Sequence, residues 1–79
     1  MIMSLDKLKN GCTATVKSIN TNTDLKQRLM DLGFVKGATV KAVHQSPSKN
    51  PKAYLIKGAV IALRNCDAKE IVVEADCNG

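Results

Sequence analysis

The side chains of this chain that could do chemistry are few and far apart among its 79 residues. There is one histidine, His44, and there are three cysteines, Cys12, Cys66 and Cys77. Nucleophilic catalysis needs a nucleophile, a base and an orienting group in contact, and no serine or cysteine stands in a strained turn motif. The cysteines lack the C-x-x-C spacing of metal knuckles and redox dithiols, so we interpret Cys12 and Cys66 as small core or turn residues. We therefore expect no enzyme and no catalytic residue.

Cofactor and metal sites are not indicated either. Phosphate-binding glycine loops lie between a strand and a helix, whereas Gly33 and Gly37 follow the segment that we expect to be helical. A ferrous ion would need several His, Asp or Glu side chains to converge, and His44 has only Val43 and Gln45 beside it. We expect no cofactor and no metal ligand, and we interpret His44 as a partly exposed structural residue.

One short amphipathic helix is predicted within residues 25–37. Leu25, Leu29 and Leu32 recur at the helical i, i+4, i+7 spacing, and Met30 widens this apolar stripe. Isolated helices below roughly 12–15 residues are marginal in water, so the helix needs tertiary support. We expect the three leucines to attach it to a sheet.

The ends of this helix are marked by capping residues. Thr23 or Asp24 is expected to cap the start. Gly33 suits the left-handed position that ends a helix, because it has no Cβ, and Phe34 can pack back onto the last turn. Gly37 is expected to supply the positive φ of a tight turn after the helix.

The rest of the chain is typical of short strands. Alternating apolar and polar residues and bounding turn residues predict strands at residues 12–19, 38–45, 53–57, 59–64 and 71–74. Gly58 is expected in a two-residue hairpin turn, and residues 46–52 in a polar surface loop. Pairing the last strand with an early one would close the sheet and remove its exposed edges. We predict one domain over residues 1–79, all-β with one short α-helix, folded as a small barrel.

Composition supports a cytoplasmic address. The apolar segment at the start is too short for a signal peptide, and no run approaches the roughly 18 apolar residues of a membrane span.

Three motifs in order resemble the FeoA family of ferrous iron transport accessory proteins. They are LxxLxxG at residues 5–11, LxxRLxxLGFxxG at residues 25–37 and VIALRxxDAxxIxV at residues 60–73, with Pro47 and Pro51 around a polar loop. Lys36 stands where the family usually has proline, and Asp67 where it usually has glutamate. The resemblance implies an SH3-like barrel and a non-enzymatic cytoplasmic protein. It also implies a partner, FeoB, the membrane protein that carries ferrous iron and bears a cytoplasmic GTPase domain.

Charge is unevenly distributed along a chain whose net charge is +5. Basic residues predominate from residue 26 to residue 57, where Asp31 is the one acid, and acidic residues predominate from residue 66 onward. The basic segment is either a solvated surface, a docking face for an acidic partner, or a nucleic-acid site. Nucleic acid ranks third, because Phe34 and Tyr54 are the only aromatic residues available for stacking.

Two sets of residues follow from these patterns. The residues predicted to bind a partner are Lys26, Arg28, Lys36, Lys41 and Tyr54. The residues predicted to be structural are Leu25, Leu29, Leu32, Gly33, Gly37, Gly58 and Arg64. Arg28 has a structural alternative, in which it bonds carbonyls near Arg64 and Asp67.

Three functions remain open at this point. The first is an adaptor that docks on a FeoB-like transporter and modulates iron uptake. The second is a free-standing accessory domain of a metal regulator that binds a transition metal. The third is a small basic nucleic-acid-binding barrel, and self-association through a strand edge is compatible with any of them.

Overall fold

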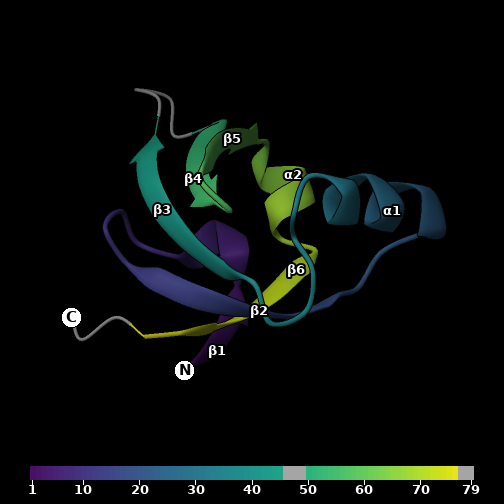
Figure 1. Ribbon diagram of the computed structural model, residues 1–79, viewed down its shortest axis with the longest axis horizontal. Helices are drawn as coiled ribbons and strands as arrows, with labels where there is room; N and C mark the ends of the chain where they lie inside the picture. The colour runs from purple at the N-terminus through teal and green to yellow at the C-terminus, as the bar shows by residue number, and fades with distance from the viewer. Residues whose placement is uncertain (46–49, 77–79) are drawn as a thin grey trace.

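The computed structural model, which describes residues 1–45 and 50–76 and leaves aside the side chains of residues 44 and 45, is a curled antiparallel sheet with one helix beside it (Figure 1). The six strands pair in the order β1-β6-β2-β3-β4-β5. The elements are β1 (Ile2–Ser4), the 3-10 helix η1 (Leu5–Lys7), β2 (Thr13–Ile19), α1 (Thr23–Asp31), β3 (Thr39–Gln45), β4 (Lys52–Ile56), β5 (Ala59–Leu63), α2 (Asn65–Ala68) and β6 (Ile71–Ala75). The predicted class, all-β with one short helix, is confirmed.

All five predicted strands are present within one residue of their predicted bounds, and the last one pairs with an early one as expected. β6 pairs with β2, with Val73 opposite Val16. The sequence interpretation missed β1, which is only three residues long and pairs with the other side of β6. It was also wrong about closure, because β1 and β5 remain as edges of the sheet.

Side chains, rather than strand pairing, join the open side of the sheet to η1. The ammonium group of Lys52 on β4 donates hydrogen bonds to the carbonyl oxygens of Asp6, at 3.1 Å, and Leu8, at 2.8 Å. The hydroxyl group of Tyr54 donates to the carbonyl oxygen of Leu5 at 3.4 Å. These bonds link segments more than 40 residues apart in sequence, so they stabilise the curled shape of the sheet.

The alternation along β2 changes phase at a bulge. Ala14 and Val16 point into the core, as predicted, but the next buried residue is Ile19 rather than Ser18. The register with β6 shifts between Val16 and Ser18, so Lys17 is the extra residue. A bulge bends its strand and increases the twist, which helps a small sheet to curl.

Both ends of α1 are capped by local hydrogen bonds. The N-cap is Asn22, not Thr23 or Asp24, and its side-chain oxygen accepts from the backbone N–H of Leu25 at 2.9 Å. At the other end Gly33 has φ of +115° and donates to the carbonyl oxygen of Met30, while Phe34 donates to that of Leu29. This pair of bonds is a Schellman motif, so the predicted helix end at Gly33 is confirmed.

The other two predicted turn glycines also take left-handed conformations. Gly37 has φ of +90°, and the backbone N–H of Ala38 donates to the carbonyl oxygen of Val35 across the turn. Gly58 has φ of +80° and follows Lys57, at +50°, in the two-residue turn between β4 and β5. Consecutive positive φ values at these two positions match a type I′ hairpin turn.

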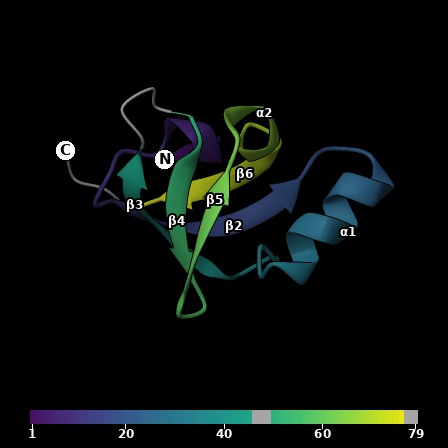
Figure 2. The same ribbon diagram turned by 90° about the horizontal axis from the view of Figure 1, so that it is seen from above.

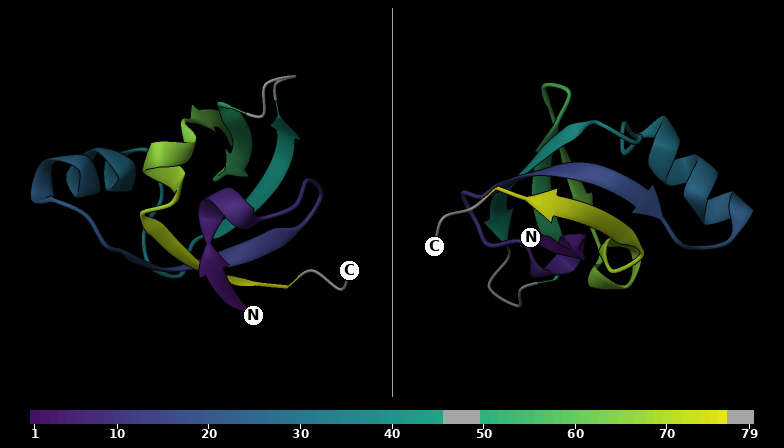
Figure 3. Two further views of the ribbon diagram at one scale, coloured as in Figure 1. Left: turned by 180° about the vertical axis from the view of Figure 1, so that it is seen from behind. Right: turned by 90° about the horizontal axis from the view of Figure 1, so that it is seen from below.

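The helix α1 lies beside the curled sheet instead of across its face (Figures 2 and 3). Leu29 is buried and Leu25 partly buried against the core, but Leu32 is 43% exposed and Met30 38% exposed. The expectation that Leu32 attaches the helix is therefore wrong. The Gly33 turn redirects the chain directly after Leu32, so the fully buried Phe34 fills the core in its place.

The cysteines differ in their states. Cys12 is buried in the core, as expected, but it is also disulfide-bonded, which we did not predict. Cys66 is an exposed free thiol near the start of α2, and Cys77 lies outside the described residues.

Candidate protein-interaction surface

A hollow of about 410 Å³ lies between α1 and β2 and carries three lysines, Lys17, Lys26 and Lys36. We call it the lysine hollow. Its remaining lining consists of Val16, Ser18, Ile19, Asn20 and Met30. The hollow therefore has a partly apolar floor, to which Ile19 and Met30 contribute, and no acidic side chain among its lining residues. All three lysine side chains are exposed, so their positive charge faces solvent.

On the opposite side of α1 a groove of about 350 Å³ separates the helix from the end of β5 and from α2. We call it the leucine groove. Its apolar lining consists of Leu25, Leu29, Leu32 and Leu63, and its charged lining of Arg28, Asp31 and Asp67. An apolar groove with a few charged groups at its rim is typical of a peptide- or ligand-binding surface.

The structure divides the predicted partner-binding residues into separate places. Lys26 and Lys36 lie together in the lysine hollow, although ten positions separate them in the sequence. Arg28 lies on the other side of the helix, in the leucine groove, and Lys41 is exposed on β3 opposite Thr13.

Tyr54 is not on the surface at all. Its side chain is 0% exposed, because alternation along β4 points it into the core. The prediction that Tyr54 binds a partner is therefore wrong, and Tyr54 is a structural residue. The alternative for Arg28 is also not observed, since within the described residues Arg28 bonds no carbonyl near Asp67. Arg64 instead forms an ion pair with Asp67, with its Nε atom 3.9 Å from the Asp67 carboxylate.

Two residues of the lysine hollow were missed from the sequence. The sequence pattern places Met30 in the apolar stripe of the helix and Lys17 among the outward residues of a strand. The bulge at Lys17 places it on the hollow, and nothing in the local pattern announces a bulge. The position of Met30 at the edge of the apolar stripe of the helix is the feature of the sequence that could have indicated its exposure.

Lys52, which is the one buried lysine among residues 1–45 and 50–76, has a structural explanation. It is 7% exposed, its ammonium group is satisfied by the two carbonyls on η1, and it lies 5.8 Å from the centre of the Tyr54 ring. Burial lowers the pKa of the Lys52 ammonium group, against the attraction of Asp6. Burial, with a smaller contribution from Asp6, raises the pKa of Tyr54 to about 12. Lys52 therefore lies apart from the lysine hollow and the leucine groove.

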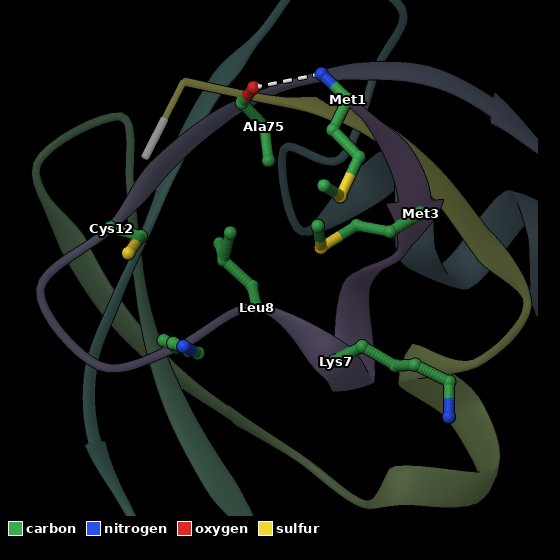
Figure 4. Close-up of a pocket in the computed structure, with 7 residues that line it drawn as sticks. Met1, Met3, Lys7, Leu8, Cys12 and Ala75 are labelled. Atoms are coloured by element: carbon green, nitrogen blue, oxygen red, sulfur yellow. Dashed lines mark hydrogen bonds between the residues drawn. The ribbon is translucent and has the colours of Figure 1, made fainter. Parts of the chain in front are cut away.

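A third cavity, of about 220 Å³, opens beside the N-terminus (Figure 4). The side chains of Met1, Met3 and Leu8 extend into it, and the N-terminal ammonium group donates to the carbonyl oxygen of Ala75 at 3.2 Å. Its lining also includes Cys12, Lys7 and Lys9. The side chains around it are apolar apart from the two lysines.

Metal ligands do not cluster in the described part of the chain. Residues 1–45 and 50–76 contain no group of three or more His, Cys, Asp or Glu side chains placed to hold an ion, and the side chain of His44 is outside what the structure describes. Among the described residues no helix is long and apolar enough to cross a membrane.

Comparison with known proteins places these features in a family. The model of the FeoA domain matches residues 3–75. The chain is 32% identical, over 71 residues, to a putative Fe(2+) transport protein A of Campylobacter jejuni, a match that covers 90% of this chain and 96% of that protein. It is also 32% identical over 72 residues to a fusion of Fe(2+) transport protein A with the Fe(2+) transporter FeoB in Porphyromonas gingivalis, where it covers 91% of this chain and 8% of the fusion.

Solved structures agree on the fold. FeoA of Stenotrophomonas maltophilia, crystallised with zinc and described as a procaryotic SH3 domain protein, superposes with a TM-score of 0.82 at 34% identity, covering 91% of this chain and 89% of that one. The predicted SH3-like architecture is therefore confirmed. With a family model spanning nearly all of its residues and a relative of matching length, this chain belongs to the FeoA domain family.

Proposed function

We propose that this protein is a non-enzymatic accessory subunit that docks on a FeoB-type ferrous iron transporter at its cytoplasmic side and modulates iron uptake. The observation that carries the proposal is the fusion in Porphyromonas gingivalis, in which a FeoA relative and FeoB form one polypeptide. Two proteins that are joined in one organism commonly associate as separate chains in another. An adaptor role also fits a domain whose described side chains form no catalytic constellation.

The lysine hollow supports an acidic partner surface. Lys17, Lys26 and Lys36 surround a hollow with no acid in its lining, on a protein of net charge +5. Complementary charge raises association rate and selectivity more than affinity, and it is screened by salt over about 10 Å at 0.1 M. We therefore expect an association rate that falls steeply as salt is added.

Apolar side chains beside the lysines supply the binding energy. Met30 and Leu32 are exposed on opposite flanks of α1, facing the lysine hollow and the leucine groove. Interfaces are held mainly by a few well-buried side chains, and methionine adapts to the shape of a partner. A partner that covers both flanks of α1 would bury both residues.

The test is binding of the purified protein to the cytoplasmic portion of the FeoB-type transporter of the same organism, by biolayer interferometry over a range of salt. The double variant K26E/K36E should weaken binding by about tenfold at low salt and flatten the salt dependence. The matched control is K7E/K9E, which changes the same charge on exposed residues beside the N-terminal cavity.

Four results would overturn the proposal or redirect it. Absence of binding to the transporter, with or without guanine nucleotide, removes the docking role. Equal weakening by both double variants means that only net charge matters. A shift of RNA or DNA in a gel at moderate salt, or stoichiometric binding of ferrous ion by calorimetry, would replace docking by the nucleic-acid or metal-binding alternative.

A further inference from the structure

Strand β5 has one free edge. It is the last strand of the sheet and pairs only with β4, over its whole length from Ala59 opposite Ile56 to Leu63 opposite Lys52. Within residues 1–45 and 50–76, no other backbone group is hydrogen-bonded to a residue of β5. A free edge presents unpaired N–H and C=O groups, which can pair with another extended chain.

The hairpin turn determines which groups these are. In a two-residue hairpin the residues flanking the turn exchange both of their backbone hydrogen bonds, and bonded and non-bonded pairs then alternate. Ala59, Ile61 and Leu63 therefore bond to β4. The N–H and C=O groups of Val60 and Ala62 point away from β4, along the free edge.

This edge lacks the usual protection against pairing. The strand Ala59–Leu63 contains no charge and no proline, and its register with β4 has no bulge. Its outer face is apolar, because Val60 is 64% exposed and lies opposite Leu55, which is 36% exposed. An added strand would gain both backbone hydrogen bonds and apolar contact.

One end of β5 adjoins the leucine groove, at Leu63. β5 lies on the α1 side of β4 in two perpendicular views (Figures 1 and 2), and its last residue, Leu63, lines the groove together with residues of the helix. A strand added to β5 would thus run between the sheet and α1.

The charges near β5 indicate whether a second copy of this chain or a different protein occupies the free edge. The strand is flanked by Lys57 in the hairpin turn and by Arg64, which is 70% exposed despite its contact with Asp67. Antiparallel pairing of two copies about Ile61 would place each Arg64 opposite Gly58 of the other copy, next to Lys57. Like charges would then meet at both ends of the paired strands, between two molecules of net charge +5.

We propose that the edge of β5 binds an extended segment of an acidic partner by strand addition, with apolar residues at the centre of the segment and acidic residues near both ends. The acidic residues lie opposite Lys57 and Arg64, and the backbone of the segment pairs with Val60 and Ala62. This deepens the proposed function, since the segment is expected in the cytoplasmic portion of the transporter. It specifies how the partner is held, not merely that it is held.

The first experiment compares A62P with A62T in binding to the transporter's cytoplasmic portion. Proline removes the outward N–H of residue 62 and leaves the ladder with β4 intact, whereas threonine keeps the N–H and changes only an exposed side chain. We expect A62P to weaken binding at least tenfold and A62T to leave it within twofold. Hydrogen exchange by NMR should show the Val60 and Ala62 amides protected only in the complex.

The outcomes separate the two proposals. If the unaltered protein does not bind the transporter, the proposed function fails. If it binds, but A62P binds equally well and the two amides exchange as fast as in the free protein, strand addition is wrong and docking stands. Dimers of the free chain that A62P abolishes would identify a second copy as the occupant and overturn the hetero-partner.

A second probe does not depend on the transporter or on the folding of a variant. It is a capped peptide of alternating valine and threonine with a glutamate at each end, compared with one that has lysine at each end and one whose pairing amides are N-methylated. We expect only the glutamate-ended, unmethylated peptide to protect the Val60 and Ala62 amides. Equal binding of all three peptides, or of none, would contradict the inference.

Discussion

Tyr54 should titrate well above a free tyrosine, and this can be followed without a label because it is the only tyrosine in the chain. Its side chain is 0% exposed and its hydroxyl group donates to the carbonyl oxygen of Leu5. Burial raises its pKa to about 12, from about 10 in the unfolded chain. We therefore expect the near-ultraviolet absorbance of tyrosinate to appear roughly two pH units later in the folded protein.

The same shift links Tyr54 to stability. Because the folded state keeps the phenolic proton longer than the unfolded state, stability is undiminished below about pH 10 and falls as the pH rises towards about 12. At about 1.36 kcal/mol per pKa unit, the loss reaches roughly 2.7 kcal/mol. A chain of 79 residues is stable by roughly 4–12 kcal/mol at 0.05–0.15 kcal/mol per residue, so it should still be folded at about pH 11.

The assay is urea unfolding at about pH 9 and about pH 11, for the unaltered protein and for Y54F, with circular dichroism to follow the fold. Lys52 acts in the opposite direction. Because its pKa is lower in the folded state, the free energy of unfolding rises as the pH rises towards the ordinary lysine value of 10.5. Lys52 is present in both proteins, so its contribution cancels when Y54F is compared with the unaltered protein. We expect Y54F to lose about 1 kcal/mol near neutral pH and to lack the alkaline decline. A titration midpoint near pH 10 in a protein that remains folded would refute the reasoning.

Three further predictions concern stability, each measured by urea unfolding. L29A should lower the free energy of unfolding by about 2–5 kcal/mol, because Leu29 is buried. L32A should lower it by less than about 1 kcal/mol, because Leu32 is 43% exposed. Similar losses for both variants would mean that α1 packs differently. G33A should lower the free energy of unfolding by about 1–2 kcal/mol from backbone strain, since φ is +115°. Steric overlap does not contribute, because the nearest atom to an added Cβ, on Lys57, would lie at 3.5 Å. An unchanged urea midpoint would argue against the left-handed turn. K52M should lower the free energy of unfolding by about 2 kcal/mol, because the carbonyl oxygens of Asp6 and Leu8 lose their donor. A more stable K52M would show that desolvation of the ammonium group outweighs its hydrogen bonds.

Local patterns predicted most of the elements. Strand alternation, the helical spacing of Leu25 and Leu29, and the positive φ at Gly33 and Gly58 depend on residues within a few positions of one another. Such short-range preferences act in the same way wherever the segment lies in the fold. The N-cap was missed by one residue because asparagine, threonine and aspartate all cap well and stand next to each other here.

The candidate site was only partly predictable, because it depends on contacts between segments that are distant in the sequence. The sequence identifies Lys26 and Lys36 by their charge, but their proximity to Lys17 depends on a bulge in β2 and on the angle at which α1 leaves the curled sheet. The burial of Tyr54 and the exposure of Leu32 likewise depend on where the curled sheet ends. No sequence window contains that information.

What the sequence determined by itself was five of the six strands, one short helix and the two-residue hairpin, because each follows from covalent geometry and short-range polarity. The family followed from the order and spacing of its motifs along the chain. What only the tertiary structure decided was the set of side chains that share a surface: the lysine hollow, the leucine groove, and the uncovered edge of β5. These arise when segments distant in sequence are brought together by burial of a common core, which excludes water from Phe34 and Tyr54 while leaving Leu32 and Val60 outside it.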